Sequence, residues 1–148
     1  MITPQTITNS RILVDTDVFS YLMKEDTRGE FFKKFLHHKS AAISFVTVAE
    51  LYFWAYKKSW GLSRITELEN KIKMYVVLPY DYSLCQRWAA IKNNCEVKGF
   101  SIGQHDCWIA AAALKYDCAL ATNNYDHFYH VENLTLISPG PTLFQKVE

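Results

Sequence analysis

The chain has 148 residues, of which 49% are hydrophobic and 21% are charged, a composition typical of one folded domain rather than of a disordered polymer. Its 16 basic and 15 acidic residues nearly cancel, so a general basic surface of the kind that wraps nucleic acid is not predicted. No apolar run approaches the roughly 20 residues of a membrane-spanning helix, and the amino terminus lacks a signal-peptide pattern. We therefore expect a soluble, cytoplasmic protein.

The four cysteines lie ten to twelve residues apart and never form a C-x-x-C pair. A chain of this length can bury a core without disulfide bonds. We therefore expect reduced thiols that serve mostly in packing, at Cys85, Cys95, Cys107 and Cys118.

Short apolar runs alternate along the chain with longer stretches of helical spacing. The first run ends abruptly at Asp15 and is typical of a strand that is buried on both faces. The predicted strands are Arg11–Val14, Ala41–Phe45, Tyr75–Leu78, Cys118–Ala121 and Leu134–Ile137. The predicted helices are Val18–Met23, Thr27–His37, Thr47–Trp60, Ser63–Met74, Ser83–Val97 and Gln104–Tyr116.

This alternation predicts an α/β fold, because parallel strands need crossover connections and helices usually provide them. We expect a mostly parallel sheet of about five strands with helices on both faces. No internal repeat or low-complexity segment interrupts the pattern. The first ten residues and the tail after Ser138 are predicted to be terminal appendages to a core of about residues 10–138.

Polar side chains follow the predicted strands, and ligands of open α/β sheets bind outside the carboxyl ends of the strands. Several carboxylates at one edge would repel one another unless a cation neutralised them, and Mg²⁺ or Mn²⁺ prefers such oxygen ligands. A metal of this kind can activate water for phosphodiester hydrolysis. The residues in question are Asp15, Thr16 and Asp17 after the first strand, Ser44, Thr47 and Glu50 after the second, Asp106 near a helix start, and Thr122, Asn124 and Asp126 after the fourth.

Each acid also has a purely structural interpretation. Asp15 would close the turn after a strand, and Asp17 is favoured as the N-cap of the Val18–Met23 helix. Asp106 suits a metal site and the first turn of a helix equally well. Glu50 favours function, because a lone carboxylate on a helix that is apolar almost all round would be costly to bury. Taken together, the four locations favour a site.

These residues resemble the PIN domain of metal-dependent ribonucleases, in particular the VapC-type toxins of bacterial toxin-antitoxin modules. The resemblance extends over nearly the whole chain, taken as one PIN-like domain over residues 1–148. Four segments in the family's order carry it: D-T-D-V from Asp15, S-F-V-T-V-A-E-L from Ser44, D-C-W-I-A-A from Asp106, and T-N-N from Thr122 with Phe128 beyond it. In the last segment some members of the family have an acid where this chain has Asn124.

The resemblance implies a three-layer α/β/α fold and a Mg²⁺- or Mn²⁺-dependent endoribonuclease, with tRNA among the candidate RNA substrates and a cognate antitoxin that holds it inactive. Asp15 and Asp106 would be the chief metal ligands, and Glu50 a further ligand or a group that orients water. Either Asn124 or Asp126 would complete the site. Supporting roles fall to Thr16, Asp17, Ser44 and Thr122.

The segment Leu51–Tyr56 is aromatic and apolar on every side, so a helix formed by it must bury more than one face. One face would meet the sheet, and the other would meet a second copy or a partner, with Trp60 and Trp88 as possible extensions of that surface. The resemblance to VapC-type proteins implies a homodimer and an antitoxin groove along such helices.

Three other interpretations of these residues compete with the nuclease. Zinc binding by His105, His127 and His130 is disfavoured, because no Cys/His quartet has the usual spacing. A haloacid-dehalogenase-like phosphatase would share the D-x-D pattern, but Val18 follows it here instead of Gly-Thr. A degenerate PIN-like module that binds RNA or protein without cleavage is the main alternative, motivated by Asn124.

Overall fold

A computed structural model describes residues 2–140. Residue 1 and residues 141–148 lie outside the described part, so most of the expected tail after Ser138 lies outside it too. The strands are β1 (Arg11–Val14), β2 (Ser40–Ser44), β3 (Val76–Leu78), β4 (Cys118–Ala121) and β5 (Leu136–Ile137). The α-helices are α1 (Thr16–Met23), α2 (Glu30–Leu36), α3 (Phe45–Lys57), α4 (Leu62–Ile72), α5 (Tyr82–Val97), α6 (Gln104–Lys115) and α7 (Tyr125–Phe128), with 3-10 turns at Pro4–Thr6 and Thr27–Gly29.

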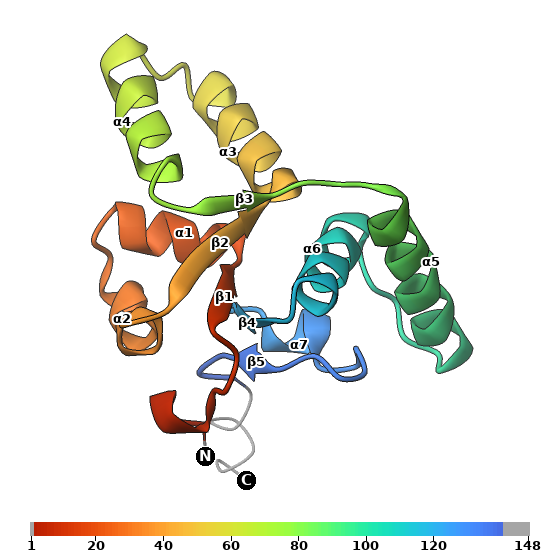
Figure 1. The fold of residues 1–148 in the computed structure, drawn as a ribbon. Coiled ribbons are helices and arrows are strands. Elements are labelled where there is room, and N and C mark those ends of the chain that lie inside the picture. Colours follow the sequence, from red (N-terminus) through yellow and green to blue (C-terminus); the bar gives the residue numbers. More distant parts are fainter. Residues whose placement is uncertain (1, 141–148) are drawn as a thin grey trace, which may run out of the picture.

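The five strands form one sheet in the order β3-β2-β1-β4-β5, and every neighbouring pair is parallel (Figure 1). The central strand β1 lies between β2 and β4, with Ile12 opposite both Ala41 and Ala119. Because all strands point the same way, their carboxyl ends share one edge of the sheet. The predicted α/β fold with a parallel, five-stranded sheet is confirmed.

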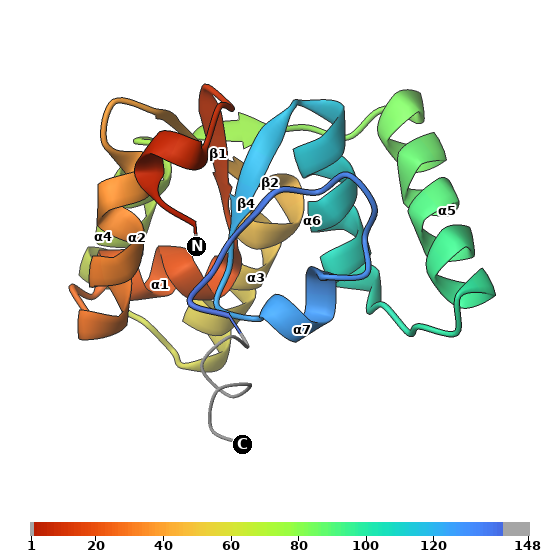
Figure 2. The ribbon, with the colours of Figure 1, turned by 90° about the horizontal axis from the view of Figure 1, so that it is seen from below.

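Helices cover both faces of the sheet. Successive residues of a strand point to opposite faces, so neighbouring residues of β1 pack against different helices. Leu13 of β1 belongs to a core cluster with residues of α5, α6 and α7. Its neighbours Ile12 and Val14 belong to a second cluster with residues of α1, α2, α3 and α4. Two views at right angles show these helix groups on opposite sides of the sheet (Figures 1 and 2). The uniformly apolar strand pattern is therefore explained by burial on both faces of the sheet.

The end of β2 and the start of α3 differ from the predicted boundaries for a local reason. The second strand ends at Ser44, whose Oγ accepts a hydrogen bond from the backbone N–H of Val46 at 3.1 Å. This N-cap starts α3 at Phe45, which the sequence pattern had assigned to the strand. The short helix α7 was not predicted, because four residues are too few to show a helical period.

The first ten residues are not the peripheral appendage that was predicted. Ile7 is buried in the same core cluster as residues of α1 and α2. Nζ of Lys39, just before β2, donates to the backbone carbonyls of Ile7 at 3.1 Å and Asn9 at 2.6 Å. The Asn9 amide in turn donates to the backbone carbonyl of Asp117, before β4. These contacts tie the amino-terminal segment to the amino ends of the strands.

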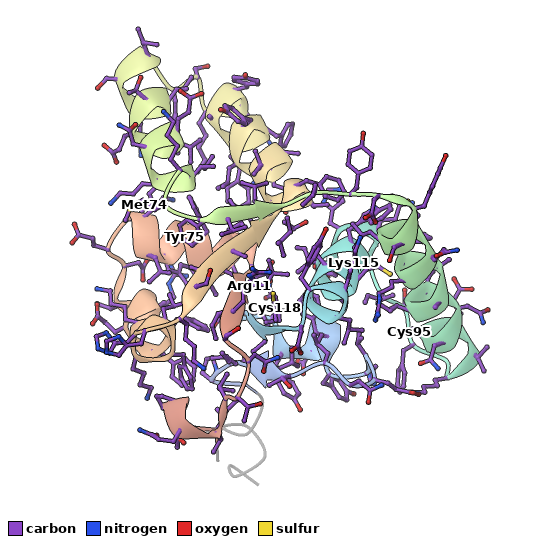
Figure 3. The ribbon with its side chains drawn as sticks, in the orientation of Figure 1. Arg11, Met74, Tyr75, Cys95, Lys115 and Cys118 are labelled. Carbon is purple, nitrogen blue, oxygen red and sulfur yellow. The ribbon has the colours of Figure 1, made fainter. Side chains whose placement is uncertain are left out.

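The cysteines carry free thiols, as predicted. Cys95 lies on α5 and Cys118 at the start of β4, beside Arg11 of β1 (Figure 3). Burial raises the pKa of the Cys107 and Cys118 thiols to about 11, so both remain protonated at neutral pH. These two residues therefore act as small apolar packing groups.

Among residues 2–140, no helix combines the length and apolar character needed to cross a membrane.

Leu68 provides a direct test of the described packing. It is fully buried on α4, whereas Leu62 on the same helix is 82% exposed. We expect Leu68→Ala to lower the free energy of unfolding by about 2–5 kcal/mol, because it leaves a cavity in the core. Leu62→Ala should change it by less than about 0.5 kcal/mol. Equal effects of the two substitutions in urea titrations would contradict the assignment of the buried face.

Candidate active site

Asp15 follows the last residue of β1 and stands at the centre of the carboxyl edge of the sheet. Its backbone N–H donates to the carbonyl of Ala121 in β4 at 2.9 Å. Thr122, the first residue after β4, therefore lies beside it. The Thr122 hydroxyl donates to Oδ2 of Asp15 at 2.6 Å, and the N–H of Thr16 donates to Oδ1 at 2.8 Å. With only 5% of its surface exposed, Asp15 is a buried carboxylate held by two donors.

Asp17 is not the N-cap of the first helix, contrary to the prediction. The helix begins at Thr16, and Asp15 occupies the N-cap position. Asp17 lies in the first turn, where its Oδ1 accepts from the N–H of Val18 at 2.7 Å. Its Oδ2 accepts from the side-chain amide of Asn124 at 3.2 Å. The second acid of the D-T-D segment therefore faces the segment that follows β4.

Glu50 approaches the same edge from α3. Its Oε1 accepts from the hydroxyl of Thr16 at 2.7 Å, and that hydroxyl lies 2.9 Å from the hydroxyl of Thr47. Since the single proton of Thr16 goes to Glu50, the Thr47 hydroxyl donates to Thr16. This chain of two buried threonines fixes Glu50 relative to α1. Ser44, predicted as a supporting residue, caps the backbone of α3.

Asp106 lies in the first turn of α6 and is fixed by a histidine rather than by a hydroxyl. Nδ1 of His127, on α7, is 2.9 Å from Oδ2 of Asp106. A second histidine, His105, places Nδ1 3.4 Å from Oε2 of Glu50. Two imidazoles therefore flank the carboxylates that come from α3 and α6.

The carboxylates affect one another electrostatically. Burial, with a smaller contribution from the charge of Asp17, raises the pKa of Asp15 to about 7. Burial is also the main cause of the raised pKa of Asp17 and of Asp106. The charge of Asp106 raises the pKa of both other aspartates, and the charge of Glu50 raises the pKa of Asp106. We call the set Asp15, Asp17, Glu50 and Asp106 the acidic site.

The donor chemistry of the acidic site fits a hard divalent cation. Its ligands would be carboxylate oxygens, and a cation would remove the repulsion that contributes to the raised pKa of Asp15. Within residues 2–140, no three His, Cys, Asp or Glu side chains lie close enough together to form a complete metal-binding site by themselves. Mg²⁺ does not require one, because it commonly binds through one or two carboxylates and retains several waters.

The segment after β4 contributes positioning contacts. Asn124, whose N–H donates to the Thr122 hydroxyl at 3.0 Å, also reaches Asp17. No hydrogen bond in the described part of the chain joins Asp126 to the acidic site. His130 stacks on Phe100 instead of pointing to the acids, so the H-x-x-H pair does not converge on a zinc ion.

Three residues of this network have contacts that the sequence did not predict. Thr47 was named only among the polar residues after the second strand, and His105 and His127 only as disfavoured zinc ligands. Two of them carried a signal. Thr47 precedes Glu50 by three residues, the spacing of neighbours on a helix face, and His105 is adjacent to Asp106. The contact of His127 depends on α7, which the sequence pattern did not predict.

A groove of about 500 Å³ adjoins the acidic site between α3 and α6. Its polar lining residues are Glu50, Gln104 and His105. Its other walls are largely aromatic, formed by Phe45, Phe53, Trp54 and Trp108 among others. The apolar helix face predicted to meet a partner therefore borders this groove, with Phe53 60% exposed.

A family model of the PIN domain matches residues 12–134. The chain therefore belongs to the PIN domain family. Among its relatives, Ribonuclease VapC1 of Haemophilus influenzae (strain R2866) is 28% identical over 124 residues, which cover 82% of this chain and 92% of the relative. Ribonuclease VapC2 of Rickettsia felis (strain ATCC VR-1525 / URRWXCal2) is 23% identical over 126 residues, which cover 84% and 94%. The predicted resemblance to VapC-type ribonucleases is confirmed.

Solved structures of toxin-antitoxin assemblies share the fold. VapBC-1 from nontypeable Haemophilus influenzae matches with a TM-score of 0.74 and 27% identity, over 86% of this chain and 97% of that one. VapBC2 from Rickettsia felis, bound to a DNA fragment from its promoter, matches with a TM-score of 0.77 over 88% and 99%. At 20% identity, the second comparison supports the fold alone.

The buried charge of Asp15 predicts a pH-dependent effect of Asp15→Asn in metal-free buffer. The folded protein binds more protons than the unfolded chain between the ordinary carboxyl pKa of 3.8 and the raised value of about 7. The ionised form therefore destabilises the fold at pH 8, and the penalty disappears as the pH falls toward 4. Asp15→Asn should raise the free energy of unfolding at pH 8 by on the order of 2–4 kcal/mol.

Urea titrations with chelator at pH 8 and pH 4 measure this difference. A stabilisation at pH 8 that shrinks toward pH 4 supports the buried charge. An Asp15→Asn protein that is less stable than wild type at pH 8 would show that the two donors outweigh the burial of the charge.

Proposed function

We propose that the protein is a divalent-metal-dependent endoribonuclease that acts as the toxin of a toxin-antitoxin pair. Membership of the PIN domain family carries the proposal, and the acidic site supports it. The alternating strands and helices bring the carboxylates of three separate motifs to one edge of the sheet. There Thr16 donates to both Asp15 and Glu50, and the charge of Glu50 raises the pKa of Asp106. The family match favours this function over a haloacid-dehalogenase-like phosphatase.

Asp15 and Asp106 are the proposed chief ligands of Mg²⁺ or Mn²⁺, and Glu50 is a further ligand or a group that orients water. When bound, the metal would activate water and stabilise charge on the phosphodiester oxygens. Thr122 holds Oδ2 of Asp15 and Thr16 holds Oε1 of Glu50, so both carboxylates are preorganised. Asn124 is the proposed fourth member of the site in preference to Asp126, because its amide contacts Asp17.

Cleavage of total RNA and of defined tRNAs tests the proposal. Wild type should give discrete cuts with Mg²⁺ or Mn²⁺ and none with EDTA. Asp15→Asn and Asp106→Asn should each lose at least about 100-fold in rate, because each removes a charged ligand of the metal. Asp126→Asn is the matched control and should keep nearly full activity, since the same chemical change falls outside the acidic site.

Two outcomes would contradict parts of this assignment. A folded wild-type protein that binds metal but cuts no RNA would favour the binding module without catalysis. An Asp126→Asn variant as inactive as Asp106→Asn would transfer the fourth position from Asn124 to Asp126.

A cognate antitoxin is the proposed protein partner, as in the VapBC complexes that share the fold. The aromatic groove beside Glu50 is the proposed place for an antitoxin segment, since a chain lying there would border the acidic site. The exposed residues Phe53, on the wall of this groove, and Tyr56, which does not line it, are the proposed contact with a second copy in a homodimer; they are 60% and 68% exposed.

Light scattering after size exclusion tests the homodimer. The double substitution Phe53→Arg and Tyr56→Arg should convert a dimer into a monomer, because it places two charges in an apolar contact. Tyr82→Arg on α5 is a control, as Tyr82 is also highly exposed but lies on another helix. A wild-type monomer at micromolar concentration, or a dimer that survives the double substitution, would contradict this interface.

A further inference from the structure

Asp106 is held differently from the other acids. Thr122 and a backbone N–H hold Asp15, Thr16 holds Glu50, and Asp17 has both a backbone N–H and an amide. In the described residues, the single hydrogen-bond partner of the Asp106 carboxylate is the imidazole of His127, 2.9 Å away. Since an ionised carboxylate can only accept, Nδ1 of His127 carries the proton of this bond.

We propose that His127 is a positioning residue of the reaction, which acts by fixing the Asp106 carboxylate for metal binding. This inference rests on the proposed function. The hydrogen bond engages Oδ2 of Asp106 and leaves Oδ1 without a hydrogen bond among residues 2–140. Partners of this kind restrict the rotation of a ligating carboxylate, and their loss typically weakens metal binding about 10- to 100-fold.

The backbone around His127 is anchored firmly enough for this role. The next residue, Phe128, is fully buried in the core cluster that includes α6. The N–H of His127 donates to the carbonyl of Asn124 at 3.0 Å, and the N–H of Asn124 donates to the Thr122 hydroxyl at 3.0 Å. The backbone of His127 therefore cannot move without disturbing a packed helix and a turn.

The same short segment reaches three acids of the site. Thr122 donates to Asp15, the Asn124 amide to Asp17, and His127 to Asp106. Residues 122–128 thus connect carboxylates that come from β1, α1 and α6. The segment supplies hydrogen-bond donors at these three places, and such donors orient the acids without adding another negative ligand.

The charges near His127 agree with a positioning role. The imidazole lowers the pKa of Asp106, although burial, the larger effect, raises it. Glu50 adds negative charge from α3, and His105 faces Glu50 at 3.4 Å and also lowers the pKa of Asp106. Removing the His127 donor would leave Asp106 partly buried beside other carboxylates without a hydrogen-bond partner, so it would be free to turn away.

Mn²⁺ binding measured by electron paramagnetic resonance, with no RNA present, tests the inference apart from activity. His127→Ala should raise the dissociation constant for Mn²⁺ about tenfold or more. His127→Asn should restore most of the affinity, because the Asn amide nitrogen lies close to the position of Nδ1. His127→Gln should behave like His127→Ala, because its amide reaches the position of Nε2 instead.

His130→Ala is the matched control, since this neighbouring histidine stacks on Phe100 and should leave Mn²⁺ affinity unchanged. His127 is 54% exposed in its side chain, so its variants should unfold at the wild-type temperature. In RNA cleavage, His127→Ala should require more metal for half-maximal rate and recover much of the rate at saturating metal.

Two results would overturn the inference while leaving the proposed function intact. One is wild-type Mn²⁺ affinity in His127→Ala, and the other is an affinity of His127→Asn as weak as that of His127→Ala. A wild-type protein that neither binds Mn²⁺ nor cleaves RNA would overturn the proposed function together with this inference.

Discussion

The burial of one carboxylate, at the end of the central strand, is the constraint around which the structure is organised. Asp15 is almost without contact with solvent, and its pKa of about 7 reflects the cost of placing its charge there. Two donors, the Thr16 N–H and the Thr122 hydroxyl, offset part of that cost. A divalent cation would offset the rest, so the feature that is unfavourable for the metal-free fold favours metal binding.

The parallel sheet determines which groups meet Asp15. Because β4 lies directly beside β1, Thr122 leaves its strand next to Asp15. Because β2 lies on the other side of β1, the helix that starts at its end brings Glu50 to the same edge. Asp106 arrives from the first turn of α6, the helix that leads into β4. Residues that are far apart in the chain therefore meet without any long loop.

Much of this arrangement could be predicted from the sequence. The strands Arg11–Val14 and Cys118–Ala121 were predicted with the observed bounds, since uniformly apolar runs bounded by polar residues are typical of central parallel strands. The carboxyl ends of such strands share an edge, so the meeting of Asp15 and Glu50 followed from topology.

What could not be predicted depends on single hydrogen bonds and on short elements. The first helix starts at Thr16, so the capping role fell to Asp15 rather than Asp17. A shift of two residues in a helix start is enough to exchange these roles. The contact between His127 and Asp106 joins two helices of which one, α7, is a single turn without a recognisable period.

We propose that Asp15 at the end of β1, Glu50 on α3 and Asp106 in the first turn of α6 hold a divalent cation. Anomalous X-ray diffraction from crystals of the protein soaked in Mn²⁺ measures this directly. We predict an anomalous peak within coordination distance, about 2.2 Å, of oxygens of Asp15 and Asp106. A fully soaked crystal with a peak elsewhere, or with none beside these two residues, would contradict the claim.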